Sequence, residues 1–252
     1  MIGGHTYRHR YPVHYYDCDG QLRATVLAFL RWFEDLALLQ SEDYGVGIAF
    51  YEKEQVAWLL SRWDIRLHRT LRHRDEADIL TQPMGMRRFL ANRRYAVYRA
   101  DGALAAEAES QWVYINAARK RPARIPEEIF SRYGVRGDVE DLPTPQSPAA
   151  VEQVDAQREF SVRMSDIDSN GHVNNIRYVE WGLEALPEDV VRDGSLRRII
   201  VHYRKEVRYG GDVLARTQIL RETNSVVARH EILEGDAVAC AMETHWELRG
   251  EQ

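Results

Sequence analysis

The second half of the sequence repeats the first half, and this internal repeat restricts the chain to a duplicated fold. With an offset of 149, residues 15–32 align with residues 164–181. The aligned pairs in this stretch are Asp17 with Asp166, Asp19 with Asp168, Phe29 with Tyr178 and Trp32 with Trp181. Further along the chain, an offset of 136 aligns Leu67 with Tyr203 and Thr81 with Thr217, and an offset of 134 aligns Trp112 with Trp246. Three matches in the same order, with small changes of offset, predict two domains of one kind in tandem with loops of different length.

A proline-rich segment separates the two repeats. Residues 138–157 contain three prolines and no aromatic residue, a composition typical of a linker. We therefore predict an N-terminal domain over residues 1–137 and a C-terminal domain over residues 158–252, joined by this linker.

Each domain is predicted to contain an Asp-rich turn, then one helix, then several antiparallel strands. The residues at helical spacing are Val26, Phe29, Leu30, Phe33, Leu36 and Ala37 in the first half, and Ile176, Val179, Leu183 and Leu186, followed by the helix-ending Pro187, in the second. Alternating and β-branched patterns predict strands over 63–69, 93–100, 108–115, 199–207, 213–220, 225–233 and 237–248. The expected class is α+β, with a sheet wrapped around the helix that it buries.

Composition excludes several functional classes. The net charge of −5 argues against nucleic acid as the main partner, and no apolar run is long enough to span a membrane. The two cysteines, Cys18 and Cys240, are too few for a disulfide framework, and residues 1–12 have no apolar stretch typical of a signal peptide, so we expect a cytoplasmic protein. Nucleotide-binding and metal-binding motifs of the usual spacing are missing from the sequence, and we expect neither a cofactor nor a metal.

The most polar part of the chain lies just before the predicted second helix. Asp168, Asn170 and His172 belong to a cluster that continues to Asn174 and Asn175. Asp and Asn often cap helices, which explains Asn174 simply, but His is not a preferred cap. A histidine among carboxylate and amide groups can act as a general acid or base.

The first repeat lacks these proton-transferring groups. Gln21 and Arg23 align with Asn170 and His172, and Thr70 aligns with Glu206. The asymmetry predicts one active site per chain, built mainly by the second repeat; loss of polar residues by drift in the first repeat is the simpler alternative.

Residues 166–181, DIDSNGHVNNIRYVEW, resemble the signature of acyl-acyl carrier protein (acyl-ACP) thioesterases, the plant and bacterial fatty-acyl thioesterases with a double hotdog fold. The family motif D-x-N-x-H-V-N-N-x-x-Y-x-x-W is met at every fixed position from Asp168 to Trp181. Residues 111–126 also resemble the end of the family's first hotdog, so the resemblance covers nearly the whole chain. It implies a tandem hotdog fold, although the shorter D-x-x-x-H-x-N motif would also fit single-hotdog acyl-CoA thioesterases.

The resemblance also implies catalytic roles. Asp168, Asn170 and His172 occupy the family's catalytic loop, and Glu206, 34 residues after the histidine, takes the place of a fourth catalytic residue. The next family position is often Cys; here it is Val207, which excludes a cysteine acyl-enzyme at that position and favours attack by water. Without the resemblance, Glu206 reads as an exposed glutamate on the polar face of a strand.

The implied substrate is a fatty acyl chain carried by the acidic acyl carrier protein. Trp32, Phe33 and Met84 are candidates for lining an acyl slot in the first domain, or are plain core residues, and Asn174 is a candidate substrate contact. The basic residues that could dock the carrier protein, or the phosphates of coenzyme A, are Arg119, Lys120, Arg121 and Arg124; a solvated basic face explains them equally. An acyl-CoA thioesterase and a non-catalytic hotdog protein that binds acyl ligands remain alternative functions, and the chain is expected to be a monomer or a homodimer.

Overall fold

The computed structural model describes residues 3–136 and 139–248, and these form two compact units. The first unit comprises Met1–Ser61 and Leu67–Pro145, and the second comprises Arg62–Arg66 and Gln146–Gln252. The predicted boundary at residues 137–138 and the outer ends of the predicted domains, residues 1 and 252, lie outside the described residues.

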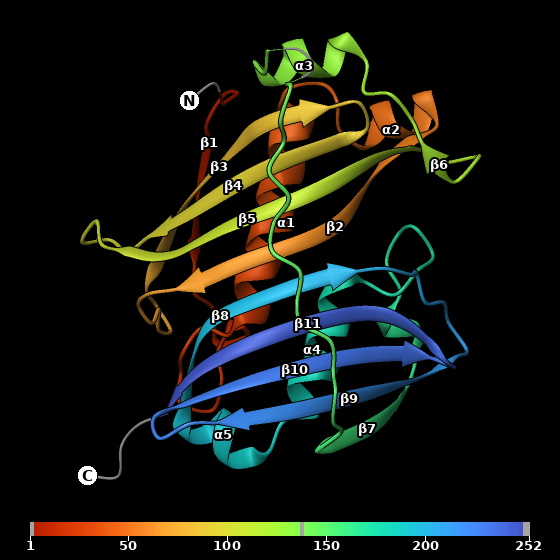
Figure 1. Ribbon diagram of the computed structural model, residues 1–252. Helices are drawn as coiled ribbons and strands as arrows, with labels where there is room; N and C mark the ends of the chain where they lie inside the picture. Colours follow the sequence, from red (N-terminus) through yellow and green to blue (C-terminus); the bar gives the residue numbers. More distant parts are fainter. Residues whose placement is uncertain (1–2, 137–138, 249–252) are drawn as a thin grey trace. The chain divides into compact units, whose positions relative to one another are not determined.

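The first unit is an antiparallel sheet that packs against a long helix (Figure 1). Its strands are β1 (Tyr7–Pro12), β2 (Val56–Leu67), β3 (Glu76–Arg87), β4 (Leu90–Tyr98), β5 (Leu104–Asn116) and the two-residue β6 (Arg121–Pro122); its helices are α1 (Val26–Asp43), α2 (Ile48–Glu54) and α3 (Glu127–Tyr133). The strand order is β1-β3-β4-β5-β2, and β6 pairs with β5. The short helices α2 and α3 are additions to the one helix predicted for this half.

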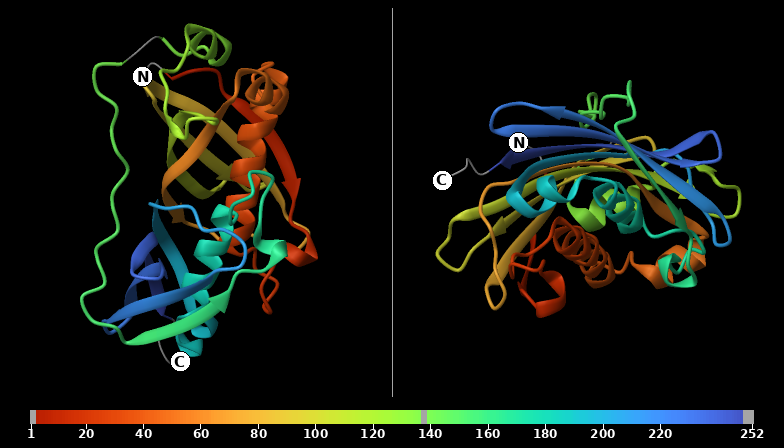
Figure 2. Two further views of the ribbon diagram at one scale, coloured as in Figure 1. Left: turned by 90° about the vertical axis from the view of Figure 1, so that its right-hand side faces the viewer. Right: turned by 90° about the horizontal axis from the view of Figure 1, so that it is seen from below.

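Helix α1 forms because a cap residue precedes an amphipathic stretch. Thr25 adopts an extended backbone conformation, and its hydroxyl accepts a hydrogen bond from Ala28 N. The predicted stripe is buried, and Leu30, Phe33 and Leu36 within it are buried completely. Figure 2 shows α1 lying along one face of the sheet of this unit.

The second unit repeats this plan. Its strands are β7 (Ala156–Ser161), β8 (Gly194–Tyr203), β9 (Asp212–Arg221), β10 (Ser225–Glu234) and β11 (Ala237–Leu248); its helices are α4 (Asn175–Glu184) and α5 (Glu188–Asp193). The strand order is β8-β11-β10-β9-β7. Arg62–Arg66, the part of β2 that belongs to this second unit, pair with β8. Helix α4 ends at Glu184, so Leu186 of the predicted helical stripe lies beyond it, because the N–H groups of Ala185 and Leu186 bond to carbonyl groups three residues back. Pro187 stands at the N-cap position of α5.

Residues paired by the sequence repeat occupy corresponding positions in the two units. Within the helices, the ring centroids of Phe29 and Trp32 are 5.2 Å apart, and those of Tyr178 and Trp181 are 5.7 Å apart. Between the helix and the edge strand, the centroid distance is 6.3 Å for Tyr11 and Trp32 and 6.0 Å for Phe160 and Trp181. The corresponding strand contacts are Thr81 opposite Tyr95 and Thr217 opposite His230, and the indole hydrogen bonds Trp112 to Ser110 and Trp246 to Thr244, at 2.8 and 2.9 Å. The repeat in the sequence therefore reflects a repeated core.

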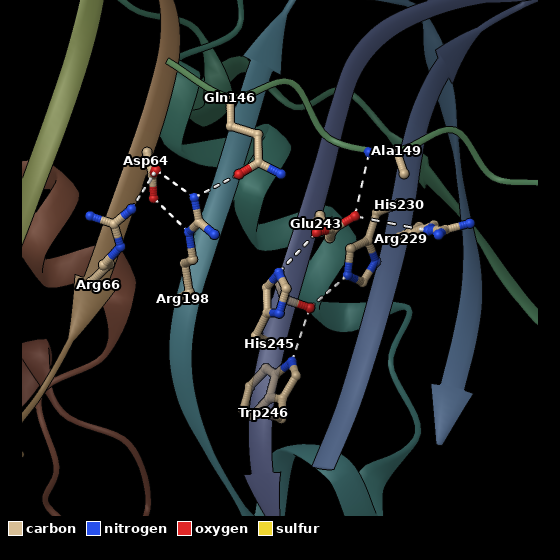
Figure 3. Close-up of polar contacts among 11 residues, drawn as sticks. Asp64, Arg66, Gln146, Ala149, Arg198, Arg229, His230, Glu243, His245 and Trp246 are labelled. Atoms are coloured by element: carbon tan, nitrogen blue, oxygen red, sulfur yellow. Dashed lines mark hydrogen bonds and ion pairs between the residues drawn. The ribbon is translucent and has the colours of Figure 1, made fainter. Parts of the chain in front are cut away.

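The segment predicted as a linker is attached to the sheet in the second unit. Arg198 Nη2 on β8 donates to Gln146 Oε1 at 2.9 Å, and Ala149 N donates to a carboxylate oxygen of Glu243 on β11 at 3.4 Å (Figure 3). Arg198 is itself held by Asp64 through two hydrogen bonds of 2.8 and 2.6 Å. These contacts lie on the face of the sheet opposite α4.

Candidate active site

The loop before α4 is closed by a carboxylate that binds its backbone. One Asp168 carboxylate oxygen accepts hydrogen bonds from the N–H groups of Asn170 at 2.8 Å and His172 at 3.4 Å, and Asp168 N donates to His172 O at 2.8 Å. Gly171 has a φ of +77°, a conformation that costs glycine little. Asp168 therefore shapes the loop that presents His172 through the backbone.

A second carboxylate anchors the start of the loop. The side chain of Asp166 is buried, and it pairs with Arg163 at 3.0 Å and Arg177 at 3.3 Å. Burial alone would raise the pKa of Asp166, but hydrogen bonds and charge from Arg163, with the charge of Arg177, hold this pKa below its usual value. Asp166 is therefore an ionised anchor of the fold near the site.

Asn174 caps helix α4. Its side-chain oxygen accepts from Ile176 N at 2.9 Å, and its carbonyl oxygen accepts from Arg177 N at 2.9 Å. Two backbone N–H groups at the helix start are thus already bonded, and the simple cap interpretation of Asn174 accounts for these contacts.

Glu206 lies in a turn and not in a strand, so the strand predicted over 199–207 is wrong in its last four residues. Strand β8 ends at Tyr203, because the N–H groups of Arg204 and Lys205 both turn to Ala239 O, at 2.8 and 3.1 Å. The alternating polar strand face proposed as the alternative explanation of Glu206 therefore does not form.

The turn brings Glu206 to His172. The distance from His172 Nε2 to a carboxylate oxygen of Glu206 is 3.0 Å, and the side chains are 17% and 41% exposed. The two segments are joined beside this contact by a backbone hydrogen bond of 2.9 Å from Val173 N to Val207 O. A carboxylate and an imidazole in contact at the protein surface can take up and deliver a proton.

The first unit has the same loop with different chemistry. Asp19 accepts from the N–H groups of Gln21 at 2.8 Å and Arg23 at 2.9 Å, as Asp168 does in its own loop. The Arg23 guanidinium bonds to Asp19 at 2.7 Å, and Thr70 stands in the position of Glu206. This loop therefore offers a guanidinium, which does not deprotonate in proteins, where the second unit has an imidazole.

The remaining predicted site residues are apart from this loop in the chain and differ in exposure. Trp32 and Phe33 are buried in the α1 core, whereas Met84 is half-buried at a break in the β3–β4 register. The predicted docking residues, all exposed around the β5–β6 hairpin and the segment after it, are Arg119, Lys120, Arg121 and Arg124.

Tyr178 is the tyrosine of the family motif, but no functional role was predicted for it from the sequence. Its hydroxyl accepts from Val207 N at 2.9 Å and donates to Lys205 O at 3.5 Å, so it contacts the peptide groups on both sides of Glu206. The available signal was the replacement of Phe29 by Tyr178 between the repeats, in a buried position.

The described residues contain neither a membrane-spanning helix nor a metal-binding cluster. No helix within residues 3–136 and 139–248 is both long and apolar enough to cross a membrane. Within the same ranges, no group of three or more His, Cys, Asp or Glu side chains is arranged to hold a metal ion.

Known proteins share the sequence and structure of both units. The family profile "Acyl-ACP thioesterase N-terminal domain" matches residues 4–133, and "Acyl-ACP thioesterase C-terminal domain" matches residues 149–248. The chain is 22% identical over 250 residues to oleoyl-acyl carrier protein thioesterase 2 of Arabidopsis thaliana, covering 91% of this chain and 67% of the relative. It is 23% identical over 263 residues to dodecanoyl-[acyl-carrier-protein] hydrolase of Cinnamomum camphora, covering 96% of this chain and 68% of the relative. Other curated relatives are longer still, and the chain spans about half the length of some.

Solved structures confirm the α+β tandem hotdog fold. A putative oleoyl thioesterase from Lactobacillus plantarum superimposes with a TM-score of 0.94 at 26% identity, covering 98% of each chain. An acyl-ACP thioesterase from Bacteroides thetaiotaomicron gives a TM-score of 0.83 at 23% identity, covering 96% of this chain and 98% of that one. The resemblance found in the sequence is confirmed: this chain belongs to the acyl-ACP thioesterase family of thioester hydrolases.

Proposed function

We propose that the loop around His172 and the turn at Glu206 form the active site at which this chain hydrolyses fatty acyl-ACP thioesters to free fatty acids. The observation that carries the proposal is the 3.0 Å contact between His172 Nε2 and the Glu206 carboxylate. This contact joins two segments that are distant in the sequence, and the first unit has Arg23 and Thr70 at the matching positions.

The proposed reaction is direct attack by water. The Glu206–His172 pair takes a proton from a water molecule as its oxygen bonds to the thioester carbonyl carbon. When the tetrahedral intermediate collapses, the C–S bond breaks, the fatty acid forms, and the phosphopantetheine sulfur leaves as a thiolate or takes up the proton. A thiol with a pKa near ~8.5, as for Cys, is a good leaving group and needs little acid assistance.

Two other loop residues support this reaction. The N–H groups of Ile176 and Arg177 at the start of α4 already donate to Asn174. The Asn170 side-chain amide is therefore proposed as the donor to the thioester carbonyl oxygen as negative charge develops there. Asp168 is proposed to orient the loop, because its contacts with His172 and Asn170 include the backbone N–H groups of both. Val207 supplies no nucleophile, so the water attacks directly.

The carrier specificity and the acyl slot are finer parts of the proposal. The exposed basic residues of the β5–β6 hairpin, such as Arg121, fit an acidic carrier protein by charge. In the first unit, Met84 is the candidate slot residue best placed to meet a ligand, because Trp32 and Phe33 are packed in the core.

The test is thiol release from acyl-ACP and matched acyl-CoA thioesters by Glu206→Ala and His172→Ala. Each variant is expected to lose about 10²- to 10⁴-fold in kcat, the usual contribution of a general acid or base, with an unchanged circular dichroism spectrum. The matched controls Thr70→Ala and Arg23→Ala alter the corresponding positions of the first unit and should keep kcat within about two-fold, as expected for side chains outside the reaction. Full activity in either site variant removes that residue from the mechanism.

A further inference from the structure

The position of Glu206 depends on the backbone of the turn that follows β8. The turn follows the last paired residue of β8, Tyr203, and the side chain of Glu206 is 41% exposed. A carboxylate on such a turn has many available positions, yet its 3.0 Å contact with His172 requires one of them. The neighbouring peptide groups must therefore be held in place.

Tyr178 holds the peptide groups on both sides of Glu206. Its hydroxyl accepts from Val207 N at 2.9 Å and donates to Lys205 O at 3.5 Å. Val207 is completely buried, so its N–H group relies on a partner inside the protein. The carbonyl group of Val207 is bonded to Val173 N, next to His172, so the same residue links the turn to the catalytic loop.

The hydroxyl is fixed and keeps its proton. The Tyr178 ring packs edge-on against Trp181 and against Tyr203, with centroid distances of 5.7 and 5.8 Å, and the residue is 3% exposed. Burial raises the pKa of Tyr178, so the group remains a neutral donor and acceptor.

The first unit shows which part of this arrangement the fold itself needs. There the backbone bond matching Val173 N to Val207 O is retained, from Ala24 N to Leu71 O at 2.9 Å. The helix residue at the position of Tyr178 is Phe29, which has no hydroxyl, and the turn residue is Thr70, which has no carboxylate. The loop and turn thus join without a tyrosine hydroxyl, and the hydroxyl occurs in the unit that carries the glutamate.

We infer that Tyr178 is a positioning residue that holds the turn so that Glu206 stays against His172 during the reaction. This inference rests on the proposed function, because it assigns Tyr178 a task through Glu206. Tyr178 itself need not touch the substrate.

The test is the variant Tyr178→Phe, which removes the hydroxyl and keeps the ring. Because Phe29 packs against Trp32 in the same way in the first unit, phenylalanine is compatible with this core. We expect kcat for acyl-ACP hydrolysis to fall about ten-fold, with KM changed less than about two-fold, because one hydrogen bond to the turn is lost and substrate contacts are retained. The matched control is Tyr133→Phe, which removes a buried hydroxyl bonded to Ser41 in the first unit and should leave kcat unchanged.

A double-mutant cycle separates positioning from a general loss of structure. In the Glu206→Gln background, followed by single-turnover thiol release with excess enzyme, Tyr178→Phe should cause no further decrease. The same decrease in both backgrounds, or a kcat within two-fold of the wild type in the single variant, would overturn the inference. Full activity of Glu206→Gln would reject the proposed catalytic role of Glu206. An inactive Glu206→Gln together with a fully active Tyr178→Phe would reject the positioning role of Tyr178 alone.

Hydrogen exchange of the wild-type protein gives an independent check. The Val207 amide should be protected as strongly as the amides of β8 and β11, because it donates to a buried hydroxyl. Fast exchange at Val207 would contradict the contact on which the inference rests.

Discussion

The buried histidine of the second unit predicts a specific loss of stability in acid. His230 on β10 is completely buried, with Nδ1 2.9 Å from Thr217 Oγ1 and Nε2 3.0 Å from Thr244 Oγ1. Thr244 Oγ1 also accepts from Trp246 Nε1 at 2.9 Å, so the imidazole belongs to a continuous buried polar chain. Burial lowers the pKa of His230 to about 3, and the ring is neutral in the folded protein.

The size of the effect follows from the difference between the folded and unfolded pKa values. The unfolded chain binds a proton near the ordinary pKa of ~6.5, whereas the folded chain resists protonation down to about 3. The unfolded state therefore gains protons first as the pH falls, and stability decreases from about pH 6.5 toward pH 3. Between pH 7.5 and pH 4.5 the loss covers about two pKa units, which corresponds to ~3 kcal/mol from this one residue.

Urea unfolding of wild type and His230→Gln, followed by tryptophan fluorescence at the two pH values, measures this contribution. The difference in the free energy of unfolding between pH 7.5 and 4.5 should be smaller in the variant by about 3 kcal/mol. Thr244→Ser, which keeps the histidine and a hydroxyl partner, should retain the wild-type difference. An equal pH dependence in wild type and His230→Gln would refute the reasoning, because another group would then cause the acid sensitivity.

Three further variants test the remaining candidate residues. Asn174→Ala should lower the free energy of unfolding by about 1 kcal/mol through loss of the helix cap, and Thr25→Ala should do the same in α1. An additional increase in KM for Asn174→Ala would show a substrate contact. Arg121→Glu should reduce kcat/KM for acyl-ACP about three- to ten-fold at low salt, while Lys53→Glu should not; equal rates would place the carrier elsewhere. Met84→Trp should shift the preferred acyl chain toward shorter lengths across a thioester panel, whereas reduced thermal stability with an unchanged preference would indicate a core role.

The sequence was most informative where the repeat and the periodicity agreed. The helices at Val26–Asp43 and Asn175–Glu184 were expected from apolar residues at helical spacing, and in the second helix Asn174 as a cap and Pro187 as a stop agreed with that spacing. The short helices α2, α3 and α5 were not expected, since helices of six or seven residues carry too little periodicity to distinguish them from loops.

The limits of the sequence are clearest at Glu206. Alternating side chains from His202 onward continue the strand pattern past the point where β8 ends. The strand stops because Arg204 N and Lys205 N share Ala239 O, a long-range contact that no local pattern encodes. The placement of Glu206 beside His172 was therefore implied by the family resemblance, and its physical cause is visible in the structure alone.

The two units together separate what the loop needs for folding from what it needs for chemistry. Asp19 and Asp168 bind the same backbone N–H groups in their own loops, and Thr25 and Asn174 both cap the helix that follows. These features are shared, so they are sufficient to build the loop. The imidazole, the glutamate and the tyrosine hydroxyl are found in the second unit, where His172 and its partners form one connected set. We propose that a role in the reaction, and not in folding, is the reason why these three groups differ together between units whose loop backbones are bonded alike.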